Sequence, residues 1–187
     1  MIRSFHPNDL EVTDFRKQIL AENKDNQYTK WFGDDKFLRN GFDQVLIYYH
    51  NNEPVGLVGG THWQEKLYRT TQMYYILDQY KGKINTLHFR PNGFFDMQLT
   101  RAKELECDGA FLSVHCFDDR HKRMYEYMRN DVVGPGMMSN KERKYTAKDF
   151  QFLDKEYTIK GVQQRVMFYP ISQDAEFESL FYSRKEK

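Results

Sequence analysis

The sequence predicts a mixed α/β domain with one central, mostly antiparallel sheet flanked by helices. Strand and helix patterns alternate along the chain, and the strands in its middle and at its end are paired as hairpins. At 187 residues the chain is long enough for one sizeable core and short for two. We therefore expect a single domain that spans residues 1–187.

The first elements are a short strand and a helix. Residues 2–5 (IRSF) are expected to form the strand. Pro7, Asn8 and Asp9 then supply turn and N-cap chemistry for a helix that begins near Leu10. Residues 22–43 are polar and rich in Asp and Asn, and we interpret them as a loop that holds one helical turn.

Three strands then follow as a meander. QVLIYYH (44–50) and VGLVGGTHW (55–63) flank the turn NNEP, and TQMYYIL (71–77) is the third strand. A long polar connection leads to an amphipathic helix over residues 94–107, with Gly109 expected as its C-terminal cap. The apolar face of this helix is formed by Phe95, Leu99, Ala102 and Leu105.

The C-terminal part predicts a strand, a helix and a closing hairpin. AFLSVHCF (110–117) has the composition of a buried strand. The helix DRHKRMYEYMRN (119–130) follows it, with Asp118 or Asp119 as its N-cap. FQFLDKEYTIKG and VQQRVMFYPI (150–171) form the final hairpin.

The composition excludes several function classes. A net charge of +1, with 40% hydrophobic and 29% charged residues, is typical of a soluble globular protein and favours neither nucleic acid nor a membrane surface. Two cysteines make no disulfide framework, and no apolar leader is visible, so a cytoplasmic protein is expected. We predict no metal site, because the spacing of Cys107, His115, Cys116 and His121 matches no zinc pattern.

Three stretches carry a resemblance to a known family. HNNEPVGLVGG (50–60), AKELECDGAFLSVHCFDDRHKRMYEYM (102–128) and RVMFYPI (165–171) resemble, in this order, segments of the GNAT superfamily of acyl-CoA-dependent N-acyltransferases. The resemblance covers nearly the whole chain. It implies the GNAT fold, acetyl-CoA as co-substrate and an amine-bearing acceptor, and it leaves a homodimer open. The composition, rich in aromatic residues, Lys, Asp and Asn, is also similar to that of acetyltransferases of large tailed phages.

The family's phosphate-binding loop, Q/R-x-x-G-x-G/A, has two imperfect copies here, residues 79–84 and 90–95. A helix that began after the first copy would run through Pro91, which favours the second copy. Free N–H groups at the start of the 94–107 helix would then form an anion site. The resemblance thus implies a cofactor-binding set of Leu77, Gly82, Lys83, Arg90, Asn92, Gly93 and Phe94, with large Phe residues where the family has small ones.

The resemblance also implies the catalytic candidates. Tyr125 matches the position of the tyrosine that often protonates the departing thiolate in this family. His115 and His62, at the ends of two strands, are candidates for the general base. Each could equally be a packing residue. The alternative function is therefore a catalytically silent GNAT-like domain that binds a partner or ligand.

Overall fold

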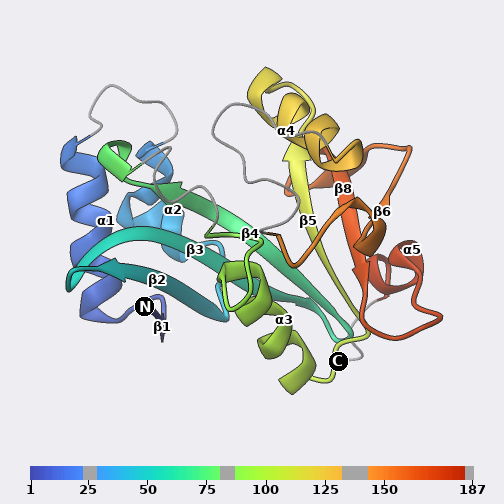
Figure 1. Cartoon of the computed structure of the whole chain (residues 1–187), viewed down its shortest axis with the longest axis horizontal. Helices are drawn as coiled ribbons and strands as arrows, with labels where there is room; N and C mark the ends of the chain where they lie inside the picture. Colours follow the sequence, from blue (N-terminus) through green and yellow to red (C-terminus); the bar gives the residue numbers. More distant parts are fainter. Residues whose placement is uncertain (23–28, 81–86, 132–142, 184–187) are drawn as a thin grey trace.

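The computed structural model describes residues 1–22, 29–80, 87–131 and 143–183 (Figure 1). Within these residues eight strands form an open sheet in the order β1-β2-β3-β4-β5-β8-β6, and β7 pairs with β8 off this path. The strands are β1 (Ile2–Phe5), β2 (Gln44–His50), β3 (Glu53–Gln64), β4 (Leu67–Ile76), β5 (Gly109–His115), β6 (Gln151–Phe152), β7 (Tyr157–Ile159) and β8 (Val162–Pro170). In this part of the chain only β4 and β5 pair in parallel, so the expected mostly antiparallel sheet is confirmed.

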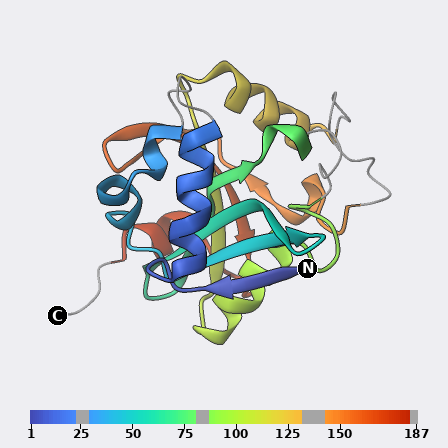
Figure 2. The ribbon, with the colours of Figure 1, turned by 90° about the vertical axis from the view of Figure 1, so that its left-hand side faces the viewer.

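Helices connect the strands in the expected order. They are α1 (Leu10–Glu22), α2 (Asp34–Leu38), α3 (Phe94–Glu104), α4 (Asp119–Arg129) and α5 (Phe177–Phe181), with 3-10 segments η1 (Thr29–Phe32), η2 (Asp78–Tyr80) and η3 (Ala147–Asp149). The sequence did not predict α5, because five residues are too few to show a helical repeat. Figure 2 shows α1 lying across the sheet from one side.

The side chains of the strands alternate between two faces. On one face, α3 and α4 cover a core that contains Phe95, Leu112 and Tyr125. On the other face, α1 packs on Val45 and Ile47, and α5 packs on the second half of the sheet. We call these the α3 face and the α1 face. They decide which polar residues can meet.

Local chemistry explains the turns that connect these elements. Asn51 and Asn52 both have left-handed backbone angles, φ 50° and 64°, as a tight hairpin turn requires between β2 and β3. Asp118 is the N-cap of α4, since its carboxylate accepts hydrogen bonds from the N–H groups of Arg120 and His121. The predicted cap at Asp118 is therefore confirmed.

The predicted cap of α3 at Gly109 is wrong. Leu105 is the C-cap, and Glu106 takes the left-handed position that follows, with φ 59°. Cys107 N–H donates to Ala102 O at 3.0 Å, which completes a Schellman motif without glycine. Gly109 instead begins β5, where an added Cβ would lie 2.4 Å from the ring of Phe168. Its smallness serves strand packing.

Candidate active site

Strands β4 and β5 part after a short paired segment. Leu67, Tyr68 and Arg69 pair with Gly109, Ala110 and Phe111, and no further residue of either strand pairs with the other. In Figure 1 the two strands begin side by side and then diverge, β5 toward α4 and β4 toward α2. Because β4 and β5 each keep their other neighbour, the sheet has an opening along the line where they separate.

The free part of β4 is irregular, which changes where its backbone groups point. Its register with β3 shifts between Leu57 and Gly59 and again between Gly59 and Thr61. Thr71 and Met73 have left-handed backbone angles, φ 60° and 56°, at these bulges. Bulges of this kind are over-represented next to active sites, because they re-aim side chains and release backbone groups from the ladder.

Two buried polar side chains hold the first bulge in place. Gln98 of α3 accepts from Thr71 N–H at 3.2 Å and donates to Gly59 O at 3.0 Å, so it bridges β4 and β3. His88 Nε2 lies 2.8 Å from Thr71 Oγ1, and burial lowers the pKa of His88 to about 3, which keeps its ring neutral. Hydrogen bonds from Gln98 and His88 thus stabilise the strained backbone conformation of Thr71.

On the α1 face, polar side chains converge where β4 and β5 separate. Arg69 is at the last residue pair of the two strands, and its Nη2 lies 3.5 Å from Ser113 Oγ. Ser113 Oγ is 2.6 Å from Gln164 Oε1, and Gln164 Nε2 donates to Ile159 O. Phe111, Ser113 and His115 alternate along β5, so the His115 side chain lies on this same face.

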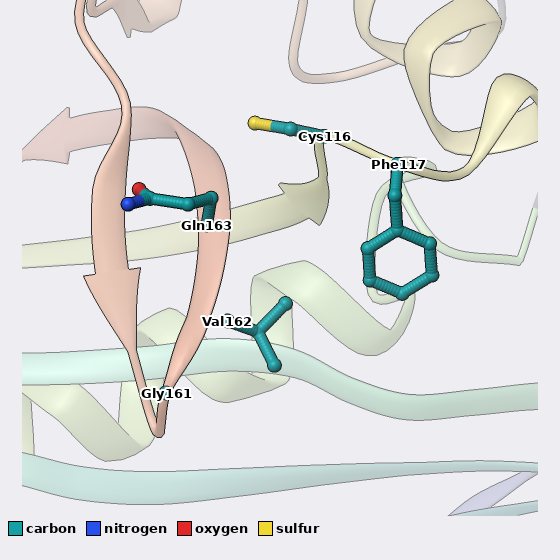
Figure 3. A pocket seen from close by; sticks show the side chains of 5 residues that line it. All are labelled: Cys116, Phe117, Gly161, Val162 and Gln163. Carbon is teal, nitrogen blue, oxygen red and sulfur yellow. The ribbon is translucent and has the colours of Figure 1, made fainter.

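His115 has the properties of a neutral base. Its Nδ1 is buried and has no hydrogen-bond partner among the described residues. Burial, and then repulsion from His121 and Arg69, lowers the pKa of His115, although Asp118 raises it in part. A shallow pocket of about 490 Å³ opens beside it, lined by Cys116, Phe117, Gly161, Val162 and Gln163 (Figure 3).

The structure does not bring His62 to the same place. His62 pairs directly with Tyr68, so it lies on the α3 face, at the end of the sheet where β4 begins. Its Nε2 lies 2.9 Å from Glu65 O within the β3–β4 turn. The two candidate bases are therefore on opposite faces, and His115 alone is next to the separation of the strands.

Tyr125 is buried on the α3 face. Its hydroxyl donates to Leu153 O over 3.3 Å, a long hydrogen bond, and its ring packs against Phe152 and under the guanidinium of Arg165. Burial raises the pKa of Tyr125, so the hydroxyl is protonated at neutral pH. In this conformation Tyr125 is a packing residue that keeps its proton.

The free N–H groups expected before α3 are not free, so this part of the phosphate-site interpretation is wrong. Gly93 N–H donates to Arg90 O, Phe94 N–H to Leu87 O and Phe95 N–H to His88 O, at 2.9–3.0 Å. Asn92 N–H donates to Asp96 Oδ2 at 2.9 Å. The chain turns back on itself before the helix and supplies its own acceptors.

Gly93 is required by this turn. An added Cβ would lie 2.2 Å from Leu87 O, the acceptor of Phe94 N–H. Gly93 is also buried. Phe94 and Phe95 are fully buried as well, and Phe95 packs edge-on against Tyr145 with ring centroids 5.0 Å apart. The large residues that depart from the family's motif are core residues.

The other predicted cofactor-binding residues are spread out. Leu77 is buried; its N–H donates to Val55 O and its carbonyl accepts from Tyr80 N–H. Arg90 lies over the ring of Tyr48, 5.3 Å from its centroid, at the edge of the sheet near the N-terminus. Gly82 and Lys83 lie outside the described residues, so the first copy of the phosphate motif stays a prediction.

Asp96 is a residue that sequence reasoning missed. It lies in the first turn of α3, and its carboxylate binds Lys144 Nζ at 3.0 Å and the Tyr145 hydroxyl at 2.5 Å, besides Asn92 N–H. Burial alone would raise the pKa of Asp96, but these hydrogen bonds outweigh burial and lower it. An acidic residue in a first helical turn is the available signal, and it names no partner.

Two searches of the described residues gave negative findings. Their His, Cys, Asp and Glu side chains contain no group of three or more placed to hold a metal ion. None of their helices combines the length and the apolar character that crossing a membrane would need.

Comparison with known proteins identifies the fold. No protein-family model matches the sequence, and no curated protein is significantly similar to it. Among solved structures, Ard1 from Thermoplasma volcanium superposes with a TM-score of 0.54 at 14% identity, over 92% of this chain and 98% of that one. The aminoglycoside 6'-N-acetyltransferase from Enterococcus faecium gives 0.56 at 11% identity, over 94% and 99% of the two chains.

A GNAT-family acetyltransferase from Staphylococcus aureus gives a TM-score of 0.55 at 11% identity, over 92% of this chain and 100% of the other. Identities this low show a shared fold and nothing finer. The fold expected from the sequence is confirmed: this chain has the fold of the GNAT acyl-CoA N-acyltransferases.

Proposed function

We propose that this chain transfers an acetyl group from acetyl-CoA to an amine. The observation that carries the proposal is the separation of β4 and β5 after three residue pairs, which opens the sheet at its parallel pair. The irregular strand lies on one side of this separation and the polar face on the other, so reactive groups lie beside it. We propose that the long, thin pantetheine arm of a CoA thioester lies along the line where the two strands part.

The residues beside the opening match the proton transfers of acyl transfer. The amine attacks the thioester carbonyl, a C–N bond forms and the C–S bond breaks. His115 is proposed to take the proton that the amine loses, since its lowered pKa keeps it neutral at physiological pH. Tyr125 is proposed to protonate the departing thiolate, because it stays protonated and its hydrogen bond to Leu153 O is long.

A polycationic acceptor is less favourable than a neutral or anionic one. One of the similar structures is an aminoglycoside 6'-N-acetyltransferase, and aminoglycosides carry several amino groups. Arg69 and Lys160 are both on the α1 face near the separation of the strands, and each lies over the ring of Trp63. Their charges would repel such a molecule.

The alternative is a catalytically silent domain that keeps the GNAT fold and binds a ligand or partner. The N–H groups before α3 already have acceptors, which removes the anion site expected at the second copy of the phosphate-binding loop and favours this alternative. Loss of CoA binding would be its signature.

A thermal-shift titration with acetyl-CoA, CoA and pantetheine tests the proposal, combined with detection of the free thiol in the presence of amines. A ligand that binds only the folded state adds about 2.7 kcal/mol to the free energy of unfolding at one hundred times its Kd, and it thereby raises the melting temperature. We expect stabilisation by acetyl-CoA and by CoA, and thiol release that needs an amine. If acetyl-CoA stabilises the protein but no amine causes release of the CoA thiol, the silent domain is supported. If neither acetyl-CoA nor CoA stabilises the protein, CoA binding is rejected.

A further inference from the structure

Arg69 is a partly buried cation with no anion beside it among the described residues. Its Nε is buried and has no acceptor among the described residues, and none of the carboxylates described there pairs with it. Its contacts are the 3.5 Å approach to Ser113 Oγ and the ring of Trp63, 5.3 Å from the guanidinium carbon. Burial lowers the pKa of Arg69 to about 10. Partial removal of a charge from water without a counter-charge costs free energy, and an anion bound at Arg69 would offset that cost.

The hydrogen bonds around Arg69 run in one direction. Gln164 donates through Nε2 to Ile159 O, so its Oε1 is the acceptor of the 2.6 Å bond from the Ser113 hydroxyl. The lone pairs of Ser113 are then left for Arg69. Each group in this series of hydrogen bonds is oriented by the next, and Arg69 at its end still has N–H groups to donate. The network positions a donor and provides no counter-charge.

A further cation, Lys160, and the neutral ring of His115 border the same space. Lys160, in the turn between β7 and β8, lies 6.0 Å from the centroid of Trp63 and donates to Asn40 O and Oδ1 at 3.4 and 3.3 Å. Burial and then repulsion from Arg69 lower the pKa of Lys160. Arg69 also repels protonated His115. The pocket in Figure 3 adjoins this cluster, since its lining includes Cys116 and Gly161, the chain neighbours of His115 and Lys160.

We propose that the acceptor amine carries an oxyanion, a carboxylate or a phosphate, which Arg69 binds from the α1 face with Lys160 assisting. The proposal rests on the acetyltransferase function above and adds the substrate class. An oxyanion would accept hydrogen bonds from the N–H groups that Arg69 leaves unused, and its charge would offset the repulsion between Arg69 and Lys160. With this group held at Arg69, the amine end of the same molecule is placed beside His115, two residues beyond Ser113 on β5.

Matched acceptor pairs test the proposal through the kinetics. β-Alanine is compared with 3-aminopropanamide, and phosphoethanolamine with ethanolamine, so that each pair differs in the oxyanion. The better pair tells a carboxylate site from a phosphate site. We expect kcat/KM to fall roughly 10–100-fold without the oxyanion, and the same loss in Arg69→Gln with the anionic acceptor, mainly in KM. Equal rates for the anionic and neutral members of both pairs would overturn the proposal.

Two controls separate binding from folding. Arg3→Gln removes an arginine that lies over an aromatic ring, Tyr49, at the far edge of the sheet, and should leave both acceptor preferences unchanged. Arg69→Gln should be as stable as the unmodified protein or more stable, because it removes a partly buried charge that has no counter-charge among the described residues. Marked destabilisation by Arg69→Gln, with no change in acceptor preference, would make Arg69 structural and reject the proposal.

A binding measurement keeps the proposal separate from the enzymatic one. The chain has two tryptophans, so Trp31→Phe leaves Trp63 as the only indole, beside Arg69 and Lys160. Acetate and inorganic phosphate are titrated against Trp63 fluorescence at constant ionic strength. A saturable change that Arg69→Gln abolishes supports the oxyanion site, even if no amine is acetylated and the proposed function fails. No saturable change with either anion, or one that persists in Arg69→Gln, rejects the site even if neutral amines are acetylated.

Discussion

His115 is the side chain whose protonation state the proposed reaction depends on. Since its pKa is lowered, the neutral form prevails until the pH falls below the usual histidine value of about 6.5. We expect kcat/KM to rise with pH along an acid limb centred below that value. His115→Asn should lower the rate by roughly 10²–10⁴-fold and remove the limb.

The pH–rate profiles of His115→Asn and His62→Asn distinguish the two histidines. His62 lies on the other face and binds Glu65 O, so His62→Asn should keep the limb. A limb that vanishes in His62→Asn and survives in His115→Asn would transfer the role of base to His62.

The hydroxyl of Tyr125 distinguishes a role as general acid from a role in packing. Tyr125→Phe keeps the ring packed on Phe152 and removes the hydroxyl that donates to Leu153 O. If the hydroxyl protonates the thiolate, turnover should fall roughly 10²–10⁴-fold while CoA affinity and the melting temperature barely change. Turnover with a panel of amines and thermal melting are measured together. Unchanged turnover in a stable variant would leave Tyr125 with packing alone.

Gly93 shows how the structure changes an expectation about a single residue. As a member of the cofactor-binding set that the resemblance implies, Gly93 would be expected to affect CoA binding more than the fold when replaced by valine. With a Cβ 2.2 Å from Leu87 O, we now expect a loss of about 3 kcal/mol or more in the free energy of unfolding. Urea denaturation measures it. Gly41→Asn is the control, since Gly41 has φ 67°, which asparagine tolerates, and open space around its Cβ position. A Gly93→Val protein as stable as this control would refute the tight turn.

At the scale of the element, Asp96 sets the start of α3. Its carboxylate already occupies the place where the sequence suggested a bound phosphate, and it joins the helix to Lys144 and Tyr145. Because the native pKa of Asp96 is lowered, its ionised form contributes stability that is present above the unfolded pKa of about 3.9 and is lost as the pH falls through the native value.

Asp96→Asn should therefore lower the free energy of unfolding by about 1–3 kcal/mol at neutral pH, and the difference should shrink toward zero in acid. Thermal or urea unfolding at several pH values measures it. Asp119→Asn, in the first turn of α4, is a matched control expected to change stability by less. A penalty that is equal at all pH values would mean that the charge of Asp96 contributes nothing.

At the scale of the whole molecule, periodicity and turn chemistry predicted most elements, including the hairpins and the Asp118 cap. They failed where a decisive contact comes from a distant segment. The carbonyl groups of Leu87 and His88 accept hydrogen bonds from the N–H groups at the start of α3, and no local sequence pattern predicts such acceptors. His115 could be chosen from its strand, but its separation from His62 depends on which face each occupies. Arg69 was not predicted at all, because an unpaired charge is visible only once its neighbours are known.

The separation of β4 and β5 also divides the sheet mechanically. β1–β4 and β5–β8 are joined by the pairs of Leu67, Tyr68 and Arg69, whereas β5 and β8 share seven pairs. The buried side chains of the two halves belong mostly to different clusters, and Leu67 and Tyr68 of β4 are the strand residues that join the clusters of the second half. Helix α3 bridges the halves as well, because Phe94 packs into one and Phe95 into the other. The two halves are therefore expected to open as partly independent cooperative units.

Native-state hydrogen exchange measures this independence. Without ligand, amides of β8 and amides of β2 should report two different opening free energies. With acetyl-CoA between β4 and β5, the two values should converge, because a molecule that contacts both halves resists the opening of either one. A single opening free energy in the free protein would contradict this picture. Two distinct values that converge when acetyl-CoA is added would mean that the co-substrate couples the two halves of the sheet. The difference between the two opening free energies would then report how much of the protein has acetyl-CoA bound.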